Sequence, residues 1–180
     1  MHGFKHLRKL PTGGDWTGGA GGASPTGILA RITAELSMRL LALTYGTEGD
    51  TRPLAMLCHG LISAGHAVTL LADGGTLGSA QALDVPHAAL EGDIHDEVVA
   101  LVSRGNGVAA ASTGLARMAL QHVSGWMRQA DAAAEGCDAI LTGGLAALVG
   151  MSVGERRGLP VIGTGMIPLT PTRCLLYTSP

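Results

Sequence analysis

The sequence is poor in charged and aromatic residues and contains almost no lysine. Of its 180 residues, 14% are charged and 3% are aromatic, and Lys5 and Lys9 are the only lysines. With a formal net charge of −2, the chain lacks the basic clusters of a nucleic-acid-binding surface, so we expect no nucleic acid among its partners. An apolar fraction of 46% excludes a largely disordered chain.

Long hydrophobic runs and patterned metal ligands are absent from the sequence as well. The apolar runs fall well short of the roughly 18 residues that a membrane span requires, which leaves at most a peripheral membrane contact. Cys58, Cys137 and Cys174 are odd in number, share no CxxC spacing, and fit neither a disulfide framework nor a zinc site. The histidines form no HExxH pair. We therefore predict a cytoplasmic protein without a metal or other resident cofactor.

The two ends differ in character from the rest of the chain. Residues 1–37 are rich in glycine and contain both lysines, and we interpret them as a disordered extension or a miscalled start, because an apolar run begins directly after Met38. Residues 174–180 resemble the translated end of a sequencing adapter and are interpreted as a non-native tail. We expect residues 38–173 to form the domain and to be the front part of a longer protein.

Short apolar segments alternate with segments of helical periodicity between these ends. The predicted strands are 39–45, 67–72, 86–90, 138–142 and 160–163. The predicted helices are 53–64, 76–83, 94–103, 108–135 and 145–157. This alternation predicts an α/β fold with a doubly wound, Rossmann-like parallel sheet. Ligands of such sheets bind at the carboxyl ends of the strands, which indicates residues 46–50, 73–75, 142–144 and 163–168.

Two familiar motifs occur in positions where their chemistry is not expected. Residues 105–110 match the dinucleotide pattern G-x-G-x-x-A, but they follow a predicted helix, whereas the motif must follow a strand and open a helix. Residues 150–154 match G-x-S-x-G inside a predicted helix, and no histidine follows to complete a catalytic triad. His122 lies on an apolar helical stripe and is expected to be a core or interface residue.

Six segments, in the same order along the chain, resemble the family 28 glycosyltransferases, which include sterol, macrolide and glycopeptide glucosyltransferases. They are residues 44–53, 64–70, 83–93, 137–141, 158–162 and 168–173. The most specific are the loop G-T-x-G-D-x-x-P, where the family pattern is G-[ST]-R-G-D-x-x-P, and the terminal P-L-T-P-T-R. Glu48 stands where the family has arginine, and Arg52 could restore positive charge nearby.

The resemblance implies the N-terminal half of a GT-B glycosyltransferase. Such an enzyme moves a hexose from a UDP- or dTDP-linked donor to a hydroxyl of a lipid, sterol or secondary metabolite. In this reading Asp50 is the catalytic base, and Gly46, Thr47 and Gly49 form the donor-phosphate and acceptor loop. A second domain, outside this chain, would carry most of the nucleotide-sugar site, so the chain alone is expected to be inactive.

The chemistry of the loop agrees with this role but leaves alternatives open. A carboxylate at the end of a strand can accept the proton of an acceptor hydroxyl, and amides before a helix can meet phosphate oxygens. Asp50 could equally be only the cap of a helix that begins near Arg52, with Pro53 in its first turn. Two other hypotheses for the function of the chain are a lipid-linked amino-sugar transferase of the GT-B fold and a non-catalytic flavodoxin-like or nucleotide-sensing module.

Overall fold

Five parallel strands form one sheet at the centre of the molecule. The computed structural model describes residues 37–93 and 108–165. The strands are β1 (Arg39–Tyr45), β2 (Ala67–Asp73), β3 (His87–Leu90), β4 (Ala139–Gly144) and β5 (Val161–Gly163), in the order β3-β2-β1-β4-β5. The helices are α2 (Glu48–Ser63), η1 (Gly74–Thr76), α3 (Gly78–Ala82), α5 (Val108–Ala133) and α6 (Ala147–Arg157). The predicted doubly wound, Rossmann-like sheet is confirmed.

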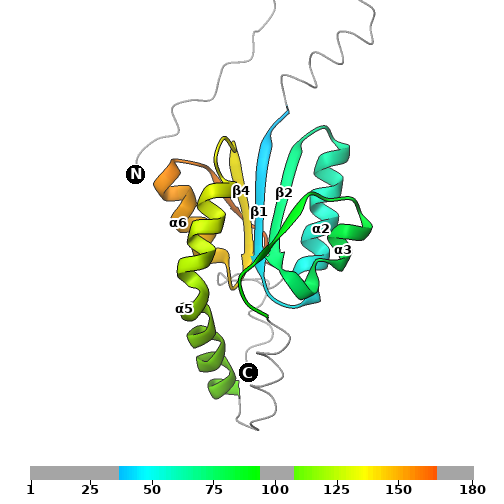
Figure 1. Cartoon of the computed structure of the whole chain (residues 1–180). Helices are drawn as coiled ribbons and strands as arrows, with labels where there is room; N and C mark the ends of the chain where they lie inside the picture. Colours follow the sequence, from blue (N-terminus) through cyan, green and yellow to red (C-terminus); the bar gives the residue numbers. More distant parts are fainter. Residues whose placement is uncertain (1–36, 94–107, 166–180) are drawn as a thin grey trace, which may run out of the picture.

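Helices cover both faces of this sheet. α2 and α3 lie on one face, and α5 and α6 lie on the other (Figure 1). Alternate residues of β1 therefore enter different cores: Leu41 and Leu43 pack in the cluster that contains α5 and α6, and Leu40 and Ala42 pack in the cluster that contains α2. Burial on both faces explains why this strand is an almost continuous apolar run.

Most predicted elements agree with the structure to within two residues, but the helix after β1 does not. The sequence predicts its start at Pro53, whereas α2 begins at Glu48, and Pro53 lies inside the helix. Thr47 caps the helix and allows it to begin early. The predicted helix at 76–83 is divided into η1 and α3. The predicted helix at 94–103, residues 105–107 of the G-x-G-x-x-A motif and the interpretations of residues 1–36 and 174–180 fall outside the described residues, and residues 108–110 of the motif begin α5.

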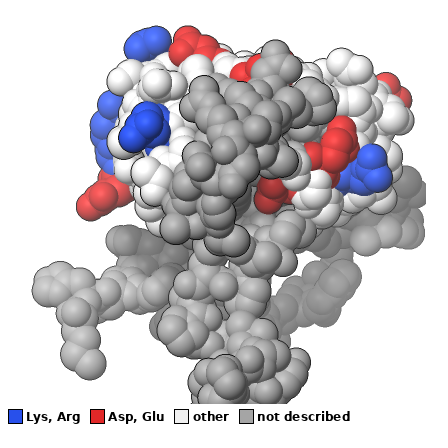
Figure 2. Space-filling model, turned by 90° about the horizontal axis from the view of Figure 1, so that it is seen from below, with Lys and Arg blue, Asp and Glu red and all other residues white. Residues whose placement is uncertain are grey.

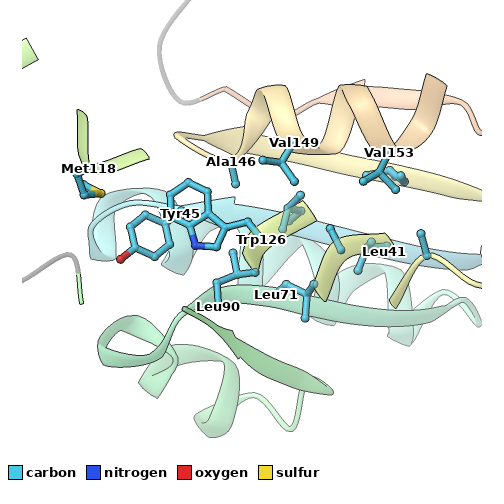
Figure 3. Packing of buried hydrophobic residues seen from close by; sticks show 13 residues of the cluster. Leu41, Tyr45, Leu71, Leu90, Met118, Trp126, Ala146, Val149 and Val153 are labelled. Atoms are coloured by element: carbon cyan, nitrogen blue, oxygen red, sulfur yellow. The ribbon is translucent and has the colours of Figure 1, made fainter. Parts of the chain in front are cut away.

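The larger core lies between the sheet and helices α5 and α6. Trp126 of α5 is fully buried there, and its ring lies against Tyr45, with Leu71 and Leu90 beside it (Figure 3). The centroids of the Tyr45 and Trp126 rings are 4.3 Å apart. In the part of the chain that the structure describes, no helix has the length and hydrophobicity of a membrane span.

An ionic contact joins the last turns of α5 and α6. Arg156 pairs with Oδ1 of Asp131, and Nε of Arg157 donates to the same oxygen at 2.6 Å. The hydrogen bonds from Arg157 and then Arg156 lower the pKa of Asp131 from 3.8 to about 2. A carboxylate whose pKa is lower in the folded state stabilises the fold at pH values above its unfolded pKa, and this contribution is lost as the pH falls through the folded pKa.

Asp131→Asn is therefore expected to destabilise the protein slightly at neutral pH and much less near pH 2. The difference between variant and wild type should narrow between about pH 4 and pH 2, the interval between the two pKa values of Asp131. Urea unfolding of both proteins at several pH values measures this difference. A gap that stays constant down to pH 2 would show that the ion pair does not contribute to stability.

Candidate functional site

The candidate site lies where β1 and β4 end side by side. The connection from β1 leads to α2 on one face of the sheet, and the connection from β4 leads to α6 on the other, so the strand order reverses between them. Ligands of doubly wound sheets bind at the carboxyl ends of strands at such a reversal. Tyr45 and Gly144 are paired in register, and the amide of Leu145 donates to the carbonyl of Tyr45 at 2.8 Å, which brings the two loops together.

The segments that the sequence predicts for ligand binding follow neighbouring strands in the sheet. The carboxyl ends of the parallel strands lie together at the lower edge of the sheet in Figure 1. At this edge are residues 46–50 after β1, 73–75 at the end of β2, 142–144 at the end of β4 and 163–165 at the end of β5. Residues 166–168 fall outside the described residues. Figure 2 views the molecule from below, onto this edge, and shows both acidic and basic side chains on the visible surface.

Asp50 occupies the third position of α2 and belongs to a capping box. Its Oδ2 accepts from the backbone amide of Thr47 at 3.1 Å, and Oγ1 of Thr47 accepts from the amide of Gly49 at 3.3 Å. The helix cap is thus Thr47, which corrects the alternative that Asp50 caps a helix starting near Arg52. Asp50 is half-buried, and among the described residues its carboxylate accepts only the bond from Thr47, at Oδ2. Among the described residues, none forms a hydrogen bond with Oδ1.

Gly46 is required by the position of the Asp50 carboxylate. A Cβ built on Gly46 would collide with Oδ2 of Asp50 and would lie 2.7 Å from its Cγ. A larger residue would push the carboxylate out of the capping box. The glycine before the cap therefore serves the close approach of a side chain that the helix start holds in place.

The predicted phosphate-binding role of Gly46, Thr47 and Gly49 meets competition within the loop. The amides of Thr47 and Gly49 already donate to the capping box, and those of Asp50 and Thr51 donate to the Thr47 carbonyl at 2.9 and 3.1 Å. A phosphate bound here would have to replace bonds that stabilise the helix start. This role stays a prediction.

Glu48, which stands where the resembling family has arginine, is bound on two sides. Nη2 of Arg52 lies 3.4 Å from its Oε2, and Oγ of Ser79 donates to the same oxygen at 3.2 Å. Arg52 therefore offsets the charge of Glu48 next to Asp50. Because both members of the ion pair are well exposed, the pair adds little to stability.

Replacing Thr47 tests the capping box directly. Thr47→Ala removes the acceptor of the Gly49 amide and should lower the free energy of unfolding by about 1 kcal/mol, the usual value for the loss of a helix cap. Thr47→Ser keeps the hydroxyl and should remain close to wild type. Urea unfolding followed by circular dichroism measures both. Equal stability of the alanine and serine variants would mean that the cap contributes nothing.

The sequence did not single out the aromatic residues beside this edge as a group. His122 stacks on Trp126 with ring centroids 5.9 Å apart, and Trp126 in turn contacts Tyr45 at the end of β1. The backbone of Gly92 lies close to Tyr45 and His122 and has a φ of +115°. A Cβ on this residue would collide with the Tyr45 hydroxyl and lie 3.3 Å from Nε2 of His122. His122 is half-buried, as expected for a residue that borders the core. Only the packed structure shows that these residues lie together near the loop that carries Asp50.

A cavity of about 380 Å³ lies at the opposite edge of the sheet. Its lining includes Arg39, His66 and Asp84, which precede or begin strands β1, β2 and β3. It is therefore distant from Asp50 and plays no part in the site. Among the described residues, no cluster of three metal-ligating side chains occurs.

Sequence relatives of this chain are glycosyltransferases. Glycosyltransferase GtfE of Amycolatopsis orientalis is 31% identical over 125 residues, which cover 68% of this chain and 29% of the relative. Sterol 3-beta-glucosyltransferase ATG26 of Gibberella zeae is 26% identical over 140 residues, which cover 76% of this chain and 9% of the relative. The chain thus spans less than a third of either relative. No family model matches it.

The solved structures that resemble the chain are glycosyltransferases as well. SsfS6 from Streptomyces sp. SF2575 is 26% identical with a TM-score of 0.57, and the match covers 74% of this chain and 41% of that one. CalG4, the calicheamicin glycosyltransferase, is 14% identical with a TM-score of 0.61 over 79% of this chain and 36% of that one, and shows the shared fold. The predicted resemblance is confirmed: the chain is a homologue of the GT-B glycosyltransferases and corresponds to one α/β part of these longer proteins.

Proposed function

We propose that the chain is the acceptor-side domain of an enzyme that transfers a hexose from a nucleoside diphosphate to a hydroxyl of a lipid, sterol or secondary metabolite. The observation that carries this proposal is the position of Asp50. Its carboxylate lies beyond the carboxyl end of the central strand, where the strand order reverses, and no described residue forms a hydrogen bond with its Oδ1. The relatives support the reaction class, and Asp50 is the proposed base at the edge of the sheet where an acceptor would bind.

In the proposed reaction, the acceptor oxygen attacks the anomeric carbon of the sugar while its proton passes to Asp50. The bond between that carbon and the phosphate oxygen breaks, and the nucleoside diphosphate leaves with the electron pair. The amide of Thr47 holds Oδ2 of the carboxylate, which leaves Oδ1 to receive the proton. Attack from the face opposite the leaving group inverts the anomeric centre.

The donor in this proposal is a uridine or thymidine diphosphate sugar. Among similar structures, SsfS6 and the spinosyn rhamnosyltransferase SpnG have been solved with thymidine diphosphate, and SpnG also with spinosyn aglycone. Because the capping box engages the loop amides, we assign most of the diphosphate binding to a second domain. The sugar nucleotide is a substrate, and we propose no resident cofactor and a cytoplasmic location.

A transfer assay tests the function. The full-length protein that carries this sequence is incubated with UDP-glucose or dTDP-glucose and with a sterol, a macrolide aglycone and a glycopeptide aglycone, and products are detected by mass spectrometry. We expect a glycoside from at least one donor–acceptor pair, and about 10²- to 10⁴-fold slower formation of it when Asp50 is replaced by asparagine. If the protein binds the nucleotide but neither transfers the sugar nor hydrolyses the donor under any condition, the result would favour the non-catalytic alternative.

A further inference from the structure

The residue that follows Asp50 forms a buried hydrogen bond to the neighbouring strand connection. Thr51 is completely buried, and its Oγ1 lies 2.8 Å from Oγ1 of Thr76 in η1. The two threonines are 25 positions apart in the sequence. Their contact joins the first turn of α2 to the segment that follows β2.

The direction of this hydrogen bond follows from the single proton of each hydroxyl. Oγ1 of Thr76 donates to the carbonyl of Asp73 at 3.0 Å, so its proton is already committed. Thr51 must therefore donate to Thr76, and the chain of bonds runs from Thr51 through Thr76 to the Asp73 carbonyl. Asp73 is the last residue of β2 and is fully buried. Its Oδ1 accepts a hydrogen bond from the amide of Gly75 at 2.9 Å. The chain ends on the rigid frame of the sheet.

The helical geometry connects this anchor to Asp50. Successive residues of an α-helix are rotated by about 100°, so a fixed inward direction for Thr51 determines the direction of Asp50. The structure has Thr51 buried and Asp50 half-exposed, in agreement with this rotation. If the first turn rotated or frayed, the bond between Oδ2 of Asp50 and the Thr47 amide would be lost along with the direction of the carboxylate.

We propose that Thr51 and Thr76 are positioning residues for transfer: their buried hydroxyl pair holds the first turn of α2 so that the Asp50 carboxylate faces the acceptor. This proposal rests on the proposed function. Neither threonine contacts the reacting atoms, and both act through the orientation of Asp50. Small displacements of a catalytic group can lower a rate by about 100-fold, so a single lost bond can have a measurable effect.

Thr51→Val in the full-length protein tests the proposal, because valine preserves the shape and removes only the donor. We expect kcat to fall about 10- to 100-fold while KM for the donor changes less than about twofold. Thr51→Ser, which restores the hydroxyl, should recover most of the rate. Thr76→Val removes the same bond from the other partner and gives a second test if Thr51→Val does not fold.

Further measurements separate positioning from a merely structural role. Rates are taken well below the melting temperature and per folded molecule, so that a lower kcat reports the position of the Asp50 carboxylate and not a loss of folded protein. Thr69→Val, at an exposed position of β2, is the matched control and should behave as wild type. A lower melting temperature with a normal kcat per folded molecule would overturn the proposal.

Asp50→Asn distinguishes the failure of the proposal from that of the proposed function. If Asp50→Asn abolishes transfer but Thr51→Val and Thr76→Val retain wild-type kcat, the positioning role is wrong and the function stands. If Asp50→Asn transfers sugar normally, the catalytic role of Asp50 fails, and the positioning role fails with it.

Discussion

Asp50→Asn should reduce sugar transfer by about 10²- to 10⁴-fold, the range typical of the loss of a general base. Asparagine has nearly the same size as aspartate but cannot accept the proton of an acceptor hydroxyl. Its amide oxygen can still accept from the Thr47 amide, which lies 3.1 Å from Oδ2 in the wild type. The loss of a negative charge in the first turn of α2 costs only about 0.3–1 kcal/mol, so the variant should remain folded.

Two further variants separate catalysis from capping. Asp50→Ala removes both the base and the bond to Thr47, so it should lose transfer and also about 1 kcal/mol of stability. Glu48→Gln removes a charge from the same turn without touching Asp50 and should retain most of the transfer activity. The measurements are initial rates with a natural acceptor and urea unfolding. Near-normal transfer by Asp50→Asn would end the catalytic assignment.

The sheet could be predicted from the sequence because each of its strands leaves a local signal. β1 is buried on both faces and is therefore a short apolar run ended by glycine, and β2 and β4 show the same pattern. The rule that ligands bind at the carboxyl ends of parallel strands then indicated the edge where Asp50 lies. These predictions need only local patterns and general rules of topology.

The start of α2 was missed although its signal is present in the sequence. Thr47 and Asp50 have the spacing of a capping box, [ST]-x-x-[DE], but Pro53 suggested a later start, because proline is favoured in the first turn of a helix. The proline in fact lies in the second turn, where it lacks the N–H of a helical hydrogen bond and its ring crowds the carbonyl four residues earlier. The capping box at Thr47 therefore sets the start of α2, and the preference of proline for the first helical turn does not.

Contacts between distant segments could not be predicted from such patterns. The bond between Thr51 and Thr76 depends on how α2 packs beside the end of β2, and the bond between Trp126 and the Glu91 carbonyl joins residues 35 positions apart. Nothing in the residues around Trp126 specifies Tyr45 as its partner. These pairs arise from the mutual arrangement of strands and helices, which only the three-dimensional structure shows.

Trp126→Ala is expected to lower the free energy of unfolding by about 3–5 kcal/mol, the usual cost of truncating a buried tryptophan. Trp126 is fully buried at the centre of the larger core and lies against Tyr45 with ring centroids 4.3 Å apart (Figure 3). The indole nitrogen also donates to the carbonyl of Glu91 at 2.7 Å, which ties the end of β3 to α5. Since whole domains are stable by only about 5–15 kcal/mol, this one change could remove much of the total.

Trp126→Phe divides this loss into its parts. Phenylalanine retains an aromatic ring beside Tyr45 but leaves the Glu91 carbonyl without its donor, so a loss of about 1–3 kcal/mol is expected, smaller than that of alanine. Urea unfolding should be followed by far-ultraviolet circular dichroism, because the substitution removes one of the two tryptophans and changes the fluorescence signal. A loss below about 1 kcal/mol for Trp126→Ala would contradict the central place of this ring in the core. Equal losses for alanine and phenylalanine would instead assign the stabilisation to the hydrogen bond that joins β3 to α5.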